Sequence, residues 1–130
     1  MAEKILMVDT PLLTDYFRKT DTPKSRLVLL SEQFEKLAIS SVTEFEVYSG
    51  ASSSQLNFWN ELLDEFKVYP FDSKAAHMAV EIQQSLKQVR RTIEKADLFI
   101  ASTAVANNLP LDTLNRKHFG NISQLLLLNS

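Results

Sequence analysis

Three carboxylates and one amide occupy positions at which a folded chain could use them together. They are Asp9, Glu46, Asp97 and Asn115, and each lies just after a predicted strand or within a predicted helix that follows a strand or loop. Oxygen ligands without histidine or cysteine suit a hard divalent cation such as Mg²⁺ or Mn²⁺. Acids gathered without a cation would repel one another, so such a cluster would either bind metal or have raised pKa values.

The segments that must position these side chains alternate in type along the chain. Short apolar runs predict strands at 4–8, 37–40, 67–70, 110–113 and 125–128. Helical spacing and capping residues predict helices at 10–18, 23–36, 43–49, from Ser53 or Ser54 to Phe66, after Asp72 and at 96–107. This alternation indicates an α/β fold, a short parallel sheet of about five strands with helices on both faces. Ligands of such sheets bind beyond the carboxyl ends of the strands, where these polar residues lie.

Composition limits the remaining possibilities. The 130 residues suit one domain, 1–130, and a hydrophobic content of 45% can form a real core. The absence of cysteine excludes disulfides, thiolate metal sites and a cysteine nucleophile. A net charge of −2 gives no overall positive field, so nucleic acid would need a local basic patch. There is no run of membrane-spanning length and no signal-peptide pattern at the start, so we expect a cytoplasmic protein without membrane contact.

Two of the acids also have ordinary structural explanations. Asp9 could cap the helix that starts at Thr10, and Asp97 could complement a helix dipole from its first turn. Asp97 shares one helix face with Ala101 and Ala104, two small residues that allow close approach of other backbone. A carboxylate on that face points inward, which weakens the dipole explanation for Asp97 more than the capping explanation for Asp9.

Two further acids need separate interpretation. Glu44 and Glu46 are about 200° apart on a helix, so they cannot both face one site, and Glu44 is interpreted as a solvated helix residue. Asp112 lies within a short strand that should be apolar if it is buried. It would either reach the site from the strand end or lie at a solvated edge, and the edge is the favoured interpretation.

Three segments resemble the motifs of PIN-domain ribonucleases, specifically the VapC toxins of toxin–antitoxin pairs. VDTPLLTDYFR resembles their opening motif, and ISSVTEFEVYSGA resembles their second motif, in which a glutamate precedes glycine by four residues. ADLFIASTAVANNLPLDTLNRKHF resembles their last block over nearly its whole length. The three segments come in the family's order and spacing, and the second one selects Glu46 over Glu44.

The resemblance implies a metal-dependent endoribonuclease with an acidic site. Carried over residue by residue, it implies Asp9, Glu46 and Asp97 as metal-binding acids and Asn115 as the fourth catalytic position. The implied cofactor is Mg²⁺ or Mn²⁺, and the implied substrate is RNA, with tRNA as one candidate. The family also implies a homodimer and a cognate antitoxin that packs into a groove.

Cations near the predicted site could contact RNA phosphates. Five of them flank Asp97 and Asn115, namely Arg90, Arg91, Lys95, Arg116 and Lys117. Each could equally be an ordinary solvated charge. His118 lies in the same turn and is interpreted as a surface or packing histidine, and His77, in mid-helix, as structural.

Two positions depart from the family pattern. Pro11 replaces the usual Asn or Ser two residues after the first acid, and Asp112 replaces a hydrophobic or small residue. Neither removes a principal acid, so they bear on the fine geometry and the rate. The alternative function is a catalytically silent PIN-like module used for binding or assembly. A receiver-like signalling domain is a poor third, because no suitable lysine follows a late strand.

Overall fold

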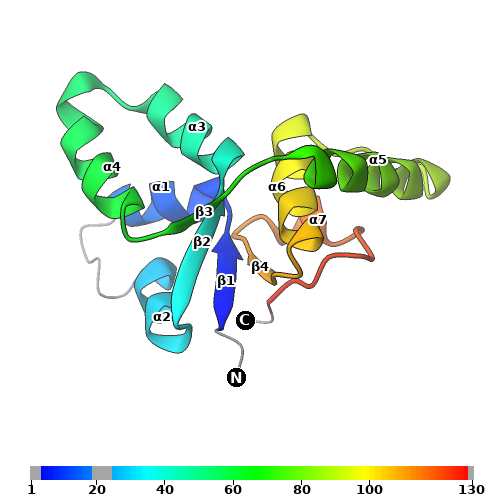
Figure 1. Cartoon of the computed structure of the whole chain (residues 1–130), viewed down its shortest axis with the longest axis horizontal. Helices are drawn as coiled ribbons and strands as arrows, with labels where there is room; N and C mark the ends of the chain where they lie inside the picture. The colour runs from blue at the N-terminus through cyan, green and yellow to red at the C-terminus, as the bar shows by residue number, and fades with distance from the viewer. Residues whose placement is uncertain (1–3, 19–24, 129–130) are drawn as a thin grey trace.

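A parallel four-stranded sheet forms the centre of the molecule (Figure 1). The computed structural model describes residues 4–18 and 25–128. The strand order is β3-β2-β1-β4, and every neighbouring pair is parallel. The strands are β1 (Ile5–Val8), β2 (Lys36–Ser40), β3 (Lys67–Tyr69) and β4 (Leu111–Asp112). The predicted α/β class, with a parallel sheet between helices, is confirmed.

Helices fill the connections between the strands, as parallel pairing requires. They are α1 (Thr10–Arg18), α2 (Arg26–Gln33), α3 (Ser41–Gly50), the short 3-10 helix η2 (Ser53–Gln55), α4 (Leu56–Leu63), α5 (Ser73–Gln88), α6 (Lys95–Ala106) and α7 (Arg116–Phe119). Side-chain caps explain where three of them start. Ser25, Ser40 and Asp72 each accept a hydrogen bond from a backbone N–H in the first turn of α2, α3 and α5.

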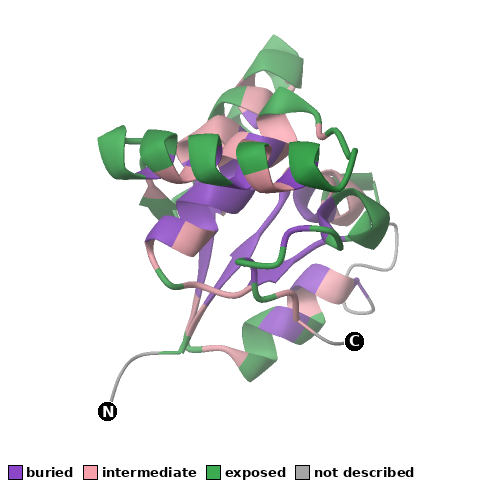
Figure 2. Ribbon diagram, turned by 90° about the vertical axis from the view of Figure 1, so that its right-hand side faces the viewer, coloured by how far each residue is buried: buried purple, intermediate pink, exposed green. Residues whose placement is uncertain are grey.

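The alternation of side chains along β1 divides the core into two layers. Leu6 and Val8 point to one face and pack with α1, α2, α3 and α4. Met7 points to the other face and packs with α5, α6 and the segment after β4. Figure 2 shows the buried strands between these two layers of partly exposed helices. The sheet is therefore covered on both faces, and its strand ends are where polar side chains can gather.

The predicted elements differ from the structure mainly at their ends. The strand expected at 125–128 is reduced to one bridge, between Leu111 and Leu127, so the sheet has four strands. The helix expected to reach Phe66 ends at Leu63, and a turn leads into β3. The helix expected to reach Lys36 ends at Gln33. It ends there because the backbone must become extended before β2 can pair with β1. Its expected start at Pro23 lies outside the described residues.

Helix length bears on the membrane question. In the part of the chain that the structure describes, none of the helices has the length and apolar character of a membrane span.

Candidate active site

Asp9 is the most buried of the predicted site residues. It follows β1 directly, its backbone N–H donates to the carbonyl oxygen of Asp112, and it is 1% exposed. The Thr113 hydroxyl donates to Asp9 Oδ2 at 2.6 Å. The other carboxylate oxygen, Oδ1, is buried without a hydrogen-bond partner. A buried carboxylate oxygen without a partner is costly, so this oxygen is free to bind a ligand.

The environment of Asp9 raises its pKa to about 7. Burial is the largest cause, because it disfavours the charged form. The carboxylates of Asp97 and Asp112 raise the pKa further. The hydrogen bond from Thr113 and the nearby Leu12 N–H act in the opposite direction. The Leu12 N–H donates to the backbone carbonyl oxygen of Asp9 at 3.2 Å, so the backbone of Asp9 begins the first turn of α1 while its side-chain Oδ1 stays without a partner.

The raised pKa of Asp9 predicts a pH-dependent stability difference for Asp9→Asn. The native carboxyl binds its proton more tightly than the unfolded chain, whose pKa is near 3.8. Protonation of Asp9 therefore stabilises the folded protein fully below pH 3.8, and this stabilisation is lost as pH rises through about 7. Without metal at pH 8, we expect Asp9→Asn to be more stable than wild type, by at most about 4 kcal/mol.

Thermal unfolding in EDTA at pH 5 and pH 8 measures this difference. The advantage of Asp9→Asn should shrink at pH 5, where the native Asp9 is protonated. If Asp9→Asn were more stable than wild type by the same amount at both pH values, the raised pKa of the buried Asp9 carboxyl would be contradicted.

Glu46 is held next to Asp9 through the following residue. Thr10 begins α1, and its hydroxyl donates to Glu46 Oε1 at 2.6 Å. The hydroxyl of Thr43 lies 3.1 Å from the same Thr10 oxygen. Glu44 lines a separate hollow between α3 and α4. The two glutamates therefore face different surroundings, as the helix geometry predicted, and Glu46 is the one near β1.

Asn115 joins this network through its backbone. Its N–H donates to Thr113 Oγ1 at 2.9 Å, and the same hydroxyl donates to Asp9. Asn115 is exposed and lies at the start of α7. The chain 113–115 thus connects the end of β4 to the acid that follows β1.

Asp97 lies in the first turn of α6 and is close enough to Asp9 to raise its pKa. Ala101 and Ala104, on the same helix face, are fully buried, as the sequence indicated. Asp97 Oδ2 lies 3.1 Å from Nδ1 of His118, whereas the sequence interpretation gave His118 no partner at the site. The structure therefore places this histidine against one of the predicted metal ligands.

Asp112 is not at a solvated edge, so that interpretation was wrong. Its side chain is 0% exposed, and both of its oxygens accept hydrogen bonds from Arg26, at 2.6 and 2.8 Å. A strand carboxylate can be buried here because a bidentate arginine neutralises it. The pair also joins α2 to β4, beside the end of β1.

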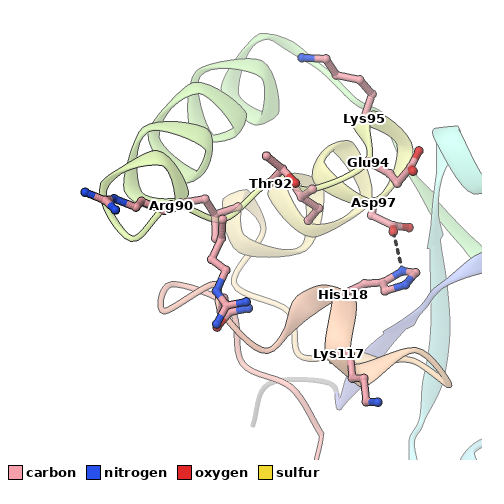
Figure 3. Close-up of a pocket in the computed structure, with 11 residues that line it drawn as sticks. Arg90, Thr92, Glu94, Lys95, Asp97, Lys117 and His118 are labelled. Atoms are coloured by element: carbon pink, nitrogen blue, oxygen red, sulfur yellow. Dashed lines mark hydrogen bonds and ion pairs between the residues drawn. The ribbon is translucent and has the colours of Figure 1, made fainter.

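A pocket of about 660 Å³ opens beside Asp97 (Figure 3). Its wall combines Asp97 and His118 with the predicted RNA contacts Arg90, Arg91, Lys95 and Lys117. In Figure 3 Lys95 and Lys117 extend away from the Asp97–His118 pair on opposite sides. Arg116 lies elsewhere, because its guanidinium donates to the carbonyl oxygen of Leu128. Four of the five predicted cations therefore lie around one pocket.

The predicted acids lie close together, but their side chains are not arranged as a complete set of metal ligands. Among residues 4–18 and 25–128, no three His, Asp or Glu side chains are arranged as a metal site. Mg²⁺ commonly uses only one or two carboxylates and keeps several waters. Asp9, with its free buried oxygen, and nearby Asp97 match that requirement. The donor set therefore fits a hydrated divalent cation.

Comparison with known proteins decides the family. The PIN domain family model matches residues 6–124. The chain belongs to the PIN-domain family. Ribonuclease VapC1 of Methanocaldococcus jannaschii is 35% identical to this PIN domain, over 94% of the chain and 84% of that protein. Ribonuclease VapC2 of Rickettsia felis is 32% identical, over 96% of the chain and 97% of that protein.

Solved structures agree with this assignment. The VapBC2 structure from Rickettsia felis, bound to a promoter DNA fragment, matches this PIN domain with a TM-score of 0.80 and 30% identity, over 97% of this chain and 98% of that one. A DNA-bound VapBC from Salmonella typhimurium has a TM-score of 0.85 over 98% of each chain, and at 21% identity it supports the fold alone. The resemblance to VapC proteins read from the motifs is confirmed.

Proposed function

We propose that residues 1–130 form a single PIN domain that acts as a metal-dependent endoribonuclease, the toxin of a toxin–antitoxin pair. The observation that carries the proposal is the buried, unpartnered Oδ1 of Asp9 beside Asp97. The names of the two VapC relatives support the reaction class. A cytoplasmic location remains a prediction from the sequence.

The acids have distinct tasks in this proposal. Asp9 and Asp97 hold Mg²⁺ or Mn²⁺. Glu46 and Asn115 lie at the edge of the site and bind the cation directly or through a water molecule. A bound cation neutralises phosphate charge and activates water for attack on phosphorus. Thr113 keeps Oδ2 of Asp9 in place, so that Oδ1 remains directed to the ligand. Thr10 does the same for Glu46.

The basic pocket supplies the RNA contacts. The pocket is lined by Arg90, Arg91, Lys95 and Lys117. An RNA strand whose phosphates contact these cations lies next to Asp97. Electrostatic binding of this kind weakens as salt is added. Arg116 is a weaker candidate because its guanidinium already contacts a backbone carbonyl.

Arg90 has a backbone conformation that glycine would adopt more easily. It follows the end of α5 with φ 57°, and the next N–H, that of Arg91, donates to Leu86 O as at many helix ends. We expect Arg90→Gly to raise stability by up to about 1 kcal/mol, because the left-handed conformation costs other residues energy. We expect the same change to weaken RNA binding.

Chemical unfolding and filter binding to a labelled hairpin RNA measure the two effects. Lys87→Gln serves as the control, because glycine at position 87 would itself destabilise the last turn of α5 by about 1 kcal/mol. It also removes one positive charge, but from a residue outside the pocket lining. Equal losses of RNA binding in Arg90→Gly and Lys87→Gln would mean that net charge, and not the pocket, determines binding.

An apolar groove of about 350 Å³ between α1, α2 and α4 suits the antitoxin. Tyr16, Leu27, Phe34, Leu62 and Phe66 line it. The VapBC2 structure from Rickettsia felis, which is 30% identical, is a toxin–antitoxin complex, and this supports a protein ligand for this surface. Val28→Glu, which places a charge on the groove wall, should stop co-purification with the protein encoded beside this one.

A homodimer is proposed through an apolar surface next to Glu46, between α3 and α6. Phe45 is 69% exposed and borders a hollow of about 380 Å³ with Val42, Ala96 and Phe99. An exposed apolar patch of this kind is typical of an interaction surface. Light scattering should give twice the monomer mass for wild type and the monomer mass for Phe45→Asp.

Cleavage of bulk tRNA and of hairpin RNA, with Mg²⁺, Mn²⁺ or EDTA, tests the proposed activity. Metal-dependent products that disappear in Asp9→Asn support the enzyme. The alternative is a catalytically silent binding module, which Pro11 after the first acid and an amide, Asn115, at the fourth position favour. A folded protein that binds its antitoxin and cleaves no RNA would establish that alternative.

A further inference from the structure

His118 and Asp97 come from different helices and meet at the wall of the basic pocket. His118 lies on α7 and Asp97 in the first turn of α6, with 3.1 Å between Nδ1 and Oδ2 (Figure 3). The histidine side chain is 54% exposed and that of Asp97 is 22% exposed. The contact therefore lies at a wet surface, where an isolated pair of this kind adds little stability.

The backbone that carries His118 is nevertheless fixed. The neighbouring Phe119 is fully buried in the core, and the N–H of His118 donates to the carbonyl oxygen of Asn115. The imidazole is thus presented to Asp97 from a rigid support. A fixed donor beside a partly exposed carboxylate restricts its rotation and lowers the entropy lost when the carboxylate binds a ligand.

The two proposed metal ligands are held in parallel ways. Thr113 donates to Oδ2 of Asp9, and His118 contacts Oδ2 of Asp97. Thr113 and His118 belong to one continuous segment, which Asn115 stiffens by donating its N–H to Thr113. One stretch of chain therefore supplies a hydrogen-bonding partner to each acid and leaves the second oxygen of each for other partners.

We propose that His118 is a positioning residue that orients Asp97 for binding of a divalent cation. An ionised carboxylate only accepts hydrogen bonds, so Nδ1 carries the proton in either charge state of the ring. This inference rests on the proposed metal site. It adds a residue that donates to a ligand and does not itself bind metal.

Matched substitutions separate the hydrogen bond from side-chain bulk. The amide nitrogen of asparagine is as many bonds from Cα as Nδ1 of histidine, and leucine has the same branched shape without a donor. We expect His118→Leu to weaken Mn²⁺ binding by about 10-fold or more, the usual effect of losing a partner of a metal ligand. We expect His118→Asn to stay within about 3-fold of wild type.

Calorimetric Mn²⁺ titration without RNA gives these affinities. The side chain is exposed, so both variants should fold, and circular dichroism checks this. Equal Mn²⁺ affinity in wild type and His118→Leu overturns the inference and leaves the proposed function standing. Mn²⁺ binding that is absent even in wild type overturns the proposed metal site and this inference with it.

The imidazole proton gives a readout that needs no metal. In nitrogen-15 NMR spectra of the neutral ring, we expect the proton of His118 on Nδ1, and we expect it to move to Nε2 in Asp97→Ala. A wild-type ring with its proton on Nε2 would contradict the proposed contact, whatever the metal titration shows.

Discussion

Asp9→Asn and Asp97→Asn are each expected to lower the rate of RNA cleavage by on the order of 100-fold or more, with the fold retained. Each change removes one negative charge from the proposed metal ligands and keeps the shape of the side chain. Asp9→Asn should still accept the hydroxyl of Thr113, so the loss would come from metal binding and not from unfolding. Initial rates with Mn²⁺ and labelled hairpin RNA measure the effect.

Glu44→Gln is the matched control for these two variants. It makes the same kind of change on a helix next to the site, but Glu44 faces the hollow between α3 and α4. Its cleavage rate should stay within about 3-fold of wild type, since it touches no proposed ligand. Cleavage that survives in both Asp9→Asn and Asp97→Asn would show that the active site lies elsewhere.

Loss of Arg26 is expected to destabilise the fold strongly. Asp112 has no exposed side-chain surface, and both of its carboxylate oxygens accept hydrogen bonds from Arg26. Arg26→Ala leaves this carboxylate buried without its cation, which we expect to cost about 3–5 kcal/mol. It also removes the charge that offsets the effect of Asp112 on nearby Asp9. Urea unfolding at pH 7 measures the loss.

Two companion variants test the reason for that loss. Asp112→Leu combined with Arg26→Met removes both charges, so it should be more stable than Arg26→Ala alone. Arg26→Lys keeps the charge but loses the paired hydrogen bonds, and it should be intermediate. If the double variant were no more stable than Arg26→Ala, an unpaired buried charge would not be the cause.

The sequence predicted the fold well because the fold depends on local patterns. Alternation of short apolar runs and amphipathic segments is enough to indicate a parallel sheet between helices. The segment 125–128 is apolar like a strand, yet it forms one bridge, because pairing with β4 depends on a partner of only two residues. Element ends such as Gln33 also depend on where the chain must turn to reach its partner.

The site was predicted in part, and the missing part consists of partners distant in sequence. Strand ends and motif spacing indicated Asp9, Glu46, Asp97 and Asn115. They could not indicate that Arg26 neutralises Asp112 from 86 positions away, or that Thr113 binds Asp9 from 104 positions away. The available signal for Thr113 was a hydroxyl two positions beyond Leu111, at the end of a strand, and only the fold could assign its partner.

Measuring Mn²⁺ binding to wild type, Asp9→Asn and Glu44→Gln at pH 7.5 asks whether the buried free oxygen of Asp9, together with Asp97, binds a divalent cation. We expect saturable binding to wild type and Glu44→Gln, and at least about 10-fold weaker binding to Asp9→Asn. Equal Mn²⁺ affinity in all three proteins would contradict this expectation.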